Sequence, residues 1–134
     1  MKSYIYRESI DILFIQEAKI TEEDDEELTQ ALKPLIVLTA LGDTPGHGNV
    51  MVIRRGLENN IIDYRVSTIQ KADASFCTII LANHTFRICN LYLSSHKDSQ
   101  HYRNDTNLLK EAENYLKAEP KAYKIIGGDL NVNM

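Results

Sequence analysis

The chain has 134 residues, 43% hydrophobic and 25% charged, which is the size and composition of one ordinary globular domain. Few prolines and glycines exclude a collagen-like or low-complexity chain, and no apolar run approaches the roughly 18 residues of a membrane span. The net charge of −4 gives no overall attraction to nucleic acid, although a local basic patch remains open. Cys77 and Cys89 are too few for a disulfide framework, and the N-terminus lacks a signal-peptide core, so we expect an intracellular protein.

The chain opens with residues 2–9, whose mixture of aromatic and charged side chains fits the end of a helix. Residues 12–15 are four consecutive apolar residues, β-branched or aromatic, and predict a buried strand. This strand delivers Gln16 and Glu17 at its C-terminal end. A carboxylate in such a place is expensive to bury without a partner, and a divalent cation is one such partner.

A helix is expected next, because Thr21 is a good N-cap and acidic residues follow it. Pro34 marks its end. The acidic run 22–27 would also suit a cation site, but a solvated helix start is the better interpretation.

Strands dominate the middle of the chain. We expect them at residues 35–38, 49–54 and 61–69, with a glycine-rich loop at 42–48. Residues 75–82 and 86–93 then predict a hairpin with its turn at 83–85. Tyr92 lies near the end of the second hairpin strand.

The last third predicts a helix that starts at Asp105 or Thr106 and runs to about Lys117. Residues 122–126 form a final strand, and residues 127–131 form the loop that leaves it. This order of elements predicts an α/β layered domain with a mixed sheet and flanking helices.

Candidate site residues gather at the ends of these strands, where α/β sheets bind ligands. Glu17 ends one strand, Tyr92 lies near the end of another, and Asp129 and Asn131 leave a third. Carboxylates suit a hard ion such as Mg²⁺, which can polarise a phosphoryl oxygen. The glycine pair 127–128 would allow a sharp turn and the close approach of a phosphate.

Each feature alone also has an ordinary structural explanation. A strand-terminal glutamate is often a surface residue, Gly-Gly-Asp is a frequent turn, and a strand tyrosine usually packs. The histidines fit no common zinc spacing. A modest basic cluster follows the tyrosine strand and could face a phosphate backbone or simply be solvated. Its members are His96, Lys97, His101, Tyr102, Arg103 and Lys110.

Four short motifs follow one another along the chain. They are Ile12-Leu13-Phe14-Ile15-Gln16-Glu17-Ala18, Gly48-Asn49-Val50-Met51-Val52-Ile53, Cys89-Asn90-Leu91-Tyr92-Leu93 and Ile125-Ile126-Gly127-Gly128-Asp129-Leu130-Asn131. Taken together and in this order, they resemble the motifs of the endonuclease/exonuclease/phosphatase superfamily, and within it most closely the endonuclease domains of non-LTR retrotransposons.

The resemblance implies the layered sandwich of this superfamily and Mg²⁺-dependent hydrolysis of phosphodiester bonds in DNA, with Mn²⁺ as a possible substitute. Glu17 would be the metal ligand, and Asp129 would align or activate the attacking water. Asn131 would hold the scissile phosphate and help place the metal, and Tyr92 would contact the phosphate near the transition state. The resemblance implies no membrane partner, and a nuclear location if the chain comes from a eukaryotic retroelement.

The chain also departs from the family. Residues 1–9 contain no Asn, so the family's first strand is missing, and no closing Ser-Asp-His follows Asn131. We therefore expect residues 1–134 to be a truncated domain that lacks the first strand and the C-terminal half. Strands 12–15 and 79–81 would then expose an apolar face and favour self-association. A non-catalytic remnant or gene-model fragment, and a phosphatase acting on a lipid or inositol phosphate, are the alternatives.

Overall fold

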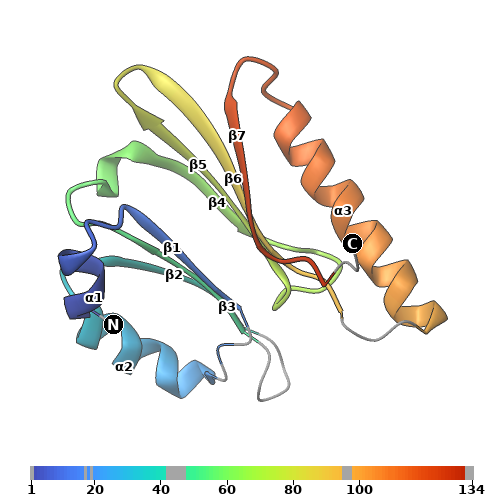
Figure 1. Cartoon of the computed structure of the whole chain (residues 1–134), viewed down its shortest axis with the longest axis horizontal. Coiled ribbons are helices and arrows are strands. Elements are labelled where there is room, and N and C mark those ends of the chain that lie inside the picture. The colour runs from blue at the N-terminus through green and yellow to red at the C-terminus, as the bar shows by residue number, and fades with distance from the viewer. Residues whose placement is uncertain (1, 17, 19, 42–47, 95–97, 132–134) are drawn as a thin grey trace.

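The computed structural model describes the whole chain except residues 1, 17, 19, 42–47, 95–97 and 132–134. Its layers are two helices, a three-stranded sheet, a four-stranded sheet and a third long helix (Figure 1). In chain order the elements are α1 (Lys2–Arg7), β1 (Ile12–Gln16), α2 (Glu22–Leu32), β2 (Ile36–Leu41), β3 (Gly48–Ile53), a 3₁₀ turn η1 (Glu58–Asn60), β4 (Ile61–Val66), β5 (Ala74–Leu81), β6 (His84–Tyr92), α3 (Ser99–Lys117) and β7 (Tyr123–Asp129).

The predicted α/β layered architecture is therefore confirmed, with the strands divided between two sheets. The first sheet has the order β1-β3-β2 and is antiparallel. The second has the order β4-β5-β6-β7; β4, β5 and β6 are antiparallel neighbours, whereas β7 runs parallel to β6. The parallel pair is possible because α3 provides the crossover between β6 and β7.

The two sheets pack face to face over an apolar core. Met51 and Ile53 of β3 meet Cys77 and Ile79 of β5, and all four are fully buried. Ile12 and Phe14 of β1 pack against the same cluster, and the alternate residues of β1 pack under the helices. The expectation that strands 12–15 and 79–81 leave an uncovered apolar face is wrong, because the two sheets cover each other.

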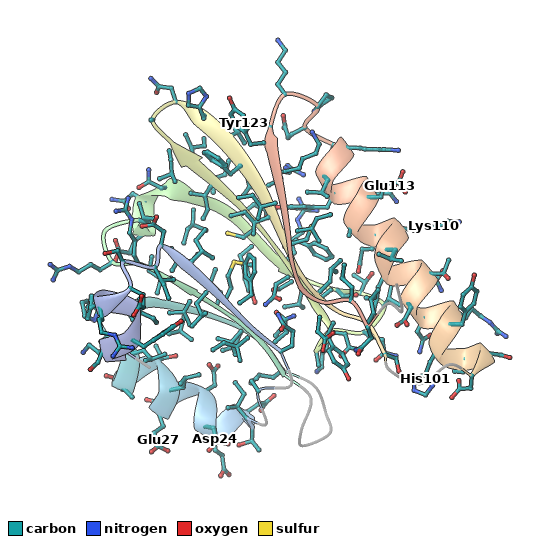
Figure 2. The ribbon with its side chains drawn as sticks, viewed as in Figure 1. Asp24, Glu27, His101, Lys110, Glu113 and Tyr123 are labelled. Atoms are coloured by element: carbon teal, nitrogen blue, oxygen red, sulfur yellow. The ribbon has the colours of Figure 1, made fainter. Side chains whose placement is uncertain are left out.

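Helices close the outer faces. α1 and α2 cover the first sheet, and the predicted cap of α2 is confirmed: Thr21 and Asp24 form a capping box. Figure 2 shows Asp24 and Glu27 on the outer side of α2, as expected for a solvated helix start. Within the described residues, no helix has both the length and the apolar character needed to cross a membrane.

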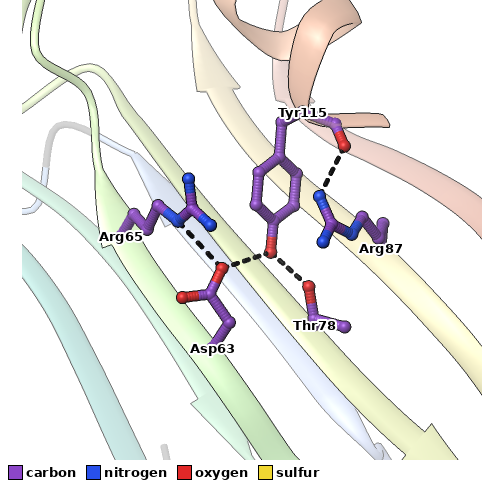
Figure 3. Close-up of polar contacts among 5 residues, drawn as sticks. All are labelled: Asp63, Arg65, Thr78, Arg87 and Tyr115. Atoms are coloured by element: carbon purple, nitrogen blue, oxygen red, sulfur yellow. Dashed lines mark hydrogen bonds and ion pairs between the residues drawn. The ribbon is translucent and has the colours of Figure 1, made fainter. Parts of the chain in front are cut away.

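α3 covers the outer face of the second sheet and is held there by polar contacts as well as apolar ones. Its buried stripe includes Leu108 and Tyr115. The Tyr115 hydroxyl donates to Asp63 over 3.2 Å and also bonds Thr78, while Arg87 donates to the Tyr115 carbonyl over 2.8 Å (Figure 3). Burial raises the pKa of Tyr115 to about 12, so the hydroxyl stays protonated and can donate.

The predicted start of α3 at Asp105 or Thr106 is wrong. The helix begins at Ser99, and Asp98 is its N-cap, accepting from the His101 amide over 2.9 Å. Asp105 instead accepts a hydrogen bond from the Ser94 amide over 3.1 Å. The helix therefore reaches back to the end of β6, the strand that carries Tyr92.

Candidate active site

The parallel pairing of β6 and β7 places two of the predicted catalytic residues side by side. Tyr92 and Asp129 are register partners at the C-terminal ends of these strands. The Leu93 amide donates to the Asp129 carbonyl over 2.9 Å, which extends the pairing by one step. The structure thus brings Tyr92 and Asp129 together as the sequence predicted.

Asn131 joins the same group. Its backbone amide donates to the Asp129 carboxylate over 3.1 Å, and its side-chain amide donates to the Leu93 carbonyl over 2.5 Å. Asn131 has a φ of 45°, a left-handed conformation that asparagine tolerates. The turn after β7 therefore folds back onto the end of β6 and holds the Asp129 and Asn131 side chains near Tyr92.

The two glycines before Asp129 have a packing role that differs from the predicted one. They lie inside β7 and not in a loop. A β-carbon on Gly127 would stand 2.2 Å from the ring of Phe14, and one on Gly128 would stand 1.9 Å from the Leu91 carbonyl oxygen. Protein atoms occupy the space where a side chain would stand on either glycine. The glycines therefore allow β1 and β6 to approach β7 closely, whereas the sequence predicted the close approach of a phosphate.

Glu17, the predicted metal ligand, lies outside the described residues. The residue before it, Gln16, ends β1 and donates from Nε2 to the Oδ1 of Asn90 over 2.5 Å. Phe14, two residues earlier, packs against Gly127 of β7. The end of β1 therefore lies against β6 and β7 at the edge where Tyr92, Asp129 and Asn131 meet.

Sequence reasoning missed the polar residues beneath this edge. Asn49 of β3, Ser75 of β5 and Asn90 of β6 are all fully buried and hydrogen-bonded between the sheets. A partial signal was present: Asn49 and Asn90 each share one face of their strand with apolar residues, and buried polar groups need partners.

The side chains at this edge offer oxygen atoms as possible metal ligands. Asp129 is exposed and supplies a carboxylate, and Asn131 supplies an amide oxygen. This donor chemistry fits Mg²⁺ better than zinc. Among the residues that the structure describes, no three His, Cys, Asp or Glu side chains are grouped as metal ligands.

The basic cluster predicted after the tyrosine strand is only partly described, because residues 95–97 lie outside the described ranges. At the start of α3, His101 pairs with Asp98 over 2.6 Å, while Tyr102 and Arg103 are exposed beside a surface hollow of about 490 Å³. Figure 2 shows Lys110 and Glu113 farther along the outer side of the same helix. Acidic and basic groups therefore alternate on this surface.

The other titratable candidates that the structure describes do not join this edge. His84 packs edge-on against Tyr123 near the opposite end of β7, and His47 lies outside the described residues. Cys77 and Cys89 are free and buried, and burial raises the pKa of both thiols to about 12. Neither thiol has the low pKa of a catalytic nucleophile.

Neither a protein-family model nor a curated protein matches this sequence. Solved structures do. D. rerio TDP2 complexed with a single-strand DNA product superposes with a TM-score of 0.72 at 14% identity, over 98% of this chain and 52% of that chain. An AP endonuclease from Archaeoglobus fulgidus matches with a TM-score of 0.70 at 18% identity, over 98% of this chain and 51% of that one.

The endonuclease domain of TRAS1, a telomere-specific non-LTR retrotransposon, also matches, with a TM-score of 0.65 at 16% identity, over 98% of this chain and 53% of that chain. The chain thus spans about half the length of the solved structures it matches. These proteins belong to the endonuclease/exonuclease/phosphatase superfamily. The chain has the fold of that superfamily, as its four motifs predicted.

Proposed function

We propose that this chain carries part of the active site of a Mg²⁺-dependent phosphodiester hydrolase that acts on DNA, of the retroelement endonuclease type. The observation that carries the proposal is the parallel register of Tyr92 and Asp129, with Asn131 folded back onto the same strand end. A carboxylate can accept a proton from water, and a phenol and an amide can donate hydrogen bonds to phosphate oxygens, so these groups at one sheet edge suit phosphate hydrolysis.

Each side chain has a defined task in this proposal. Asp129 accepts a proton from water as the water oxygen bonds to phosphorus; the bond from phosphorus to the leaving oxygen breaks, and that oxygen takes a proton from solvent to become a hydroxyl. Tyr92 donates a hydrogen bond to a non-bridging phosphate oxygen, where negative charge grows. Asn131 orients the phosphate. Mg²⁺, held with the help of Glu17, would polarise a phosphoryl oxygen.

The choice of DNA as substrate rests on the structural neighbours. One is a TDP2 complex with a single-strand DNA product, and others are an AP endonuclease and a retrotransposon endonuclease domain. The acidic balance of this chain weakens non-specific attraction to the DNA backbone. We therefore expect weak binding to DNA.

The test is a supercoiled-plasmid nicking assay on the purified chain, with Mg²⁺ or EDTA, after circular dichroism has established folding. Asp129→Ala and Glu17→Ala should each abolish Mg²⁺-dependent nicking. Glu27→Ala, which removes an exposed carboxylate on α2, is the matched control and should nick like the wild type. Nicking that survives Asp129→Ala would contradict the proposal.

The same assay tests an alternative, which arises because the chain spans only about half the length of its structural neighbours. In this alternative the chain is a non-catalytic remnant or fragment that keeps the fold without turnover. A folded wild-type chain that leaves the plasmid intact would favour it. Release of phosphate from an inositol phosphate, without plasmid nicking, would instead favour a phosphatase of the same superfamily.

A further inference from the structure

A layer of uncharged polar side chains crosses the sandwich just beneath the candidate site. Gln16 and Asn49 are register partners in the first sheet, and Ser75 and Asn90 are register partners in the second. We call these four residues the polar layer. Asn49, Ser75 and Asn90 are fully buried, and Gln16, the last residue of β1, is half-buried.

The hydrogen bonds of the polar layer have a definite direction. Asn49 Oδ1 accepts from Ser75 Oγ over 2.7 Å and from Asn90 Nδ2 over 2.8 Å. Asn49 Nδ2 donates to the Asn90 carbonyl over 3.1 Å, and Gln16 Nε2 donates to Asn90 Oδ1 over 2.5 Å. An unpaired polar group is costly in such a core, so a sliding of one sheet over the other would be opposed by several lost bonds at once.

The polar layer lies next to the candidate site along the strands. Tyr92 follows Asn90 by two residues and so points to the same face of the sheet. Gly127 is the β7 partner of Asn90, and Asp129 follows it by two residues on that face. In the first sheet, Gln16 directly precedes Glu17 in the sequence. The hydrogen bond from Gln16 to Asn90 therefore joins the end of β1, which directly precedes Glu17, to β6, which carries Tyr92.

We propose that Gln16 and Asn90 are positioning residues, whose hydrogen bond fixes the distance between the end of β1 and the paired ends of β6 and β7. This role rests on the proposed function, in which Glu17 on one side and Tyr92 and Asp129 on the other act on one phosphate. Displacement by about 1 Å is enough to lower a catalytic rate by about a hundredfold.

The structure offers a matched control for a purely structural role. Tyr64 of β4 donates to the Thr39 carbonyl of β2 over 2.7 Å and so also links the two sheets. Neither β2 nor β4 carries a candidate site residue. Gln16→Met and Tyr64→Phe each remove one inter-sheet hydrogen bond with little change of shape. If both bonds only stabilise the fold, the two variants should behave alike.

The experiment compares the two variants with the wild type by plasmid nicking and by ¹H–¹⁵N NMR. Gln16→Met should lower kcat by about 10- to 100-fold while KM for the plasmid stays near the wild-type value. It should also shift the backbone amide signals of Leu93 and Asp129. Tyr64→Phe should lower the melting temperature without changing kcat or moving those two signals.

The NMR arm separates this inference from the proposed function. If the wild type does not nick DNA, the proposed function fails, and the amide shifts still decide whether Gln16 positions the ends of β6 and β7. The inference is overturned if Gln16→Met moves the Leu93 and Asp129 signals no more than Tyr64→Phe does. It is equally overturned if an active wild type keeps its kcat in Gln16→Met.

Discussion

The backbone of Gly128 lies so close to Leu91 that a β-carbon on Gly128 would stand 1.9 Å from the Leu91 carbonyl oxygen. Gly128 also has a φ of 128°, which residues with a side chain rarely adopt. The positive φ and the lack of space for a side chain both occur at the residue directly before Asp129. The glycine pair thus lets β7 approach both β6 and β1 and carries Asp129 to its place beside Tyr92.

This geometry predicts unequal effects for two alanine substitutions. Gly128→Ala should lower the free energy of unfolding by about 3 kcal/mol or more, because backbone strain adds to a clash with main-chain atoms. Gly127→Ala should lower it by about 1–3 kcal/mol, because the Phe14 ring can turn aside. Urea unfolding measures both values.

Phe14→Leu is the control for this prediction. It removes the ring that a β-carbon on Gly127 would meet, so the double variant Phe14→Leu/Gly127→Ala should be more stable than the sum of the single effects predicts. The same Phe14→Leu change should not rescue Gly128→Ala. Equal effects of the two glycine substitutions would contradict the packing described for β7.

The cap of α3 predicts a pH-dependent contribution to stability. Hydrogen bonds from the His101 backbone and side chain lower the pKa of Asp98. A carboxyl whose pKa is lowered by folding stabilises the folded state above its unfolded pKa, and this contribution is lost as the pH falls through the folded pKa. Asp98→Ala should therefore lower the urea midpoint at pH 7, and the difference from wild type should shrink in acid.

Asp98→Asn is the matched variant, because asparagine also caps helices but does not titrate. It should retain most of the stability at pH 7. A difference between Asp98→Ala and wild type that grows as the pH falls would contradict the assignment of Asp98 as a charged cap.

Much of the fold could be predicted from local patterns. The structure confirms the strand of β1, the Thr21 cap and the hairpin strands of β5 and β6, which all depend on neighbouring residues. The residues of β1 are half-buried, and not buried as predicted, because β1 is an edge strand of its sheet. The start of α3 could not be found by the same reasoning. Its first turns are polar, and the apolar stripe that signals a helix begins only near Leu108.

The features that could not be predicted from local patterns depend on contacts between residues far apart in the sequence. The division of the strands into two sheets depends on pairing between segments far apart, such as β1 with β3, which periodicity alone does not specify. The sequence predicted that Tyr92, Asp129 and Asn131 meet at strand ends. It did not reveal the polar layer: Asn49 and Asn90 stand out among apolar neighbours, but only the register of the two sheets brings them together with Gln16 and Ser75.

The two cysteines provide a direct test of the packed core. Burial raises the pKa of both thiols to about 12, and they lie in different core clusters, on opposite sides of the second sheet. Only the thiolate reacts readily with a disulfide reagent such as DTNB. At pH 8 the folded chain should therefore label very slowly, and in urea both thiols should label at once. Rapid labelling without urea would show that the core opens.

The free edge of β7 and its exposed apolar residues provide the last prediction. β7 ends the order of strands in the second sheet as the structure describes it, and Tyr123, Ile125 and Ile126 are 57%, 38% and 54% exposed. Apolar edge strands favour association with another chain. We therefore expect reversible self-association through the β7 edge and not through the interface between the two sheets, whose residues are buried.

Ile126→Lys should weaken this association, because a charge on an edge strand opposes pairing. Ile62→Lys is the matched control, since Ile62 is 59% exposed on β4, at the opposite edge of the same sheet. Sedimentation velocity over a range of concentrations should show a mass that rises for the wild type and Ile62→Lys but stays monomeric for Ile126→Lys. A wild type that remains monomeric at every concentration would mean that the exposed apolar residues of β7 are tolerated in water, and self-association would be rejected.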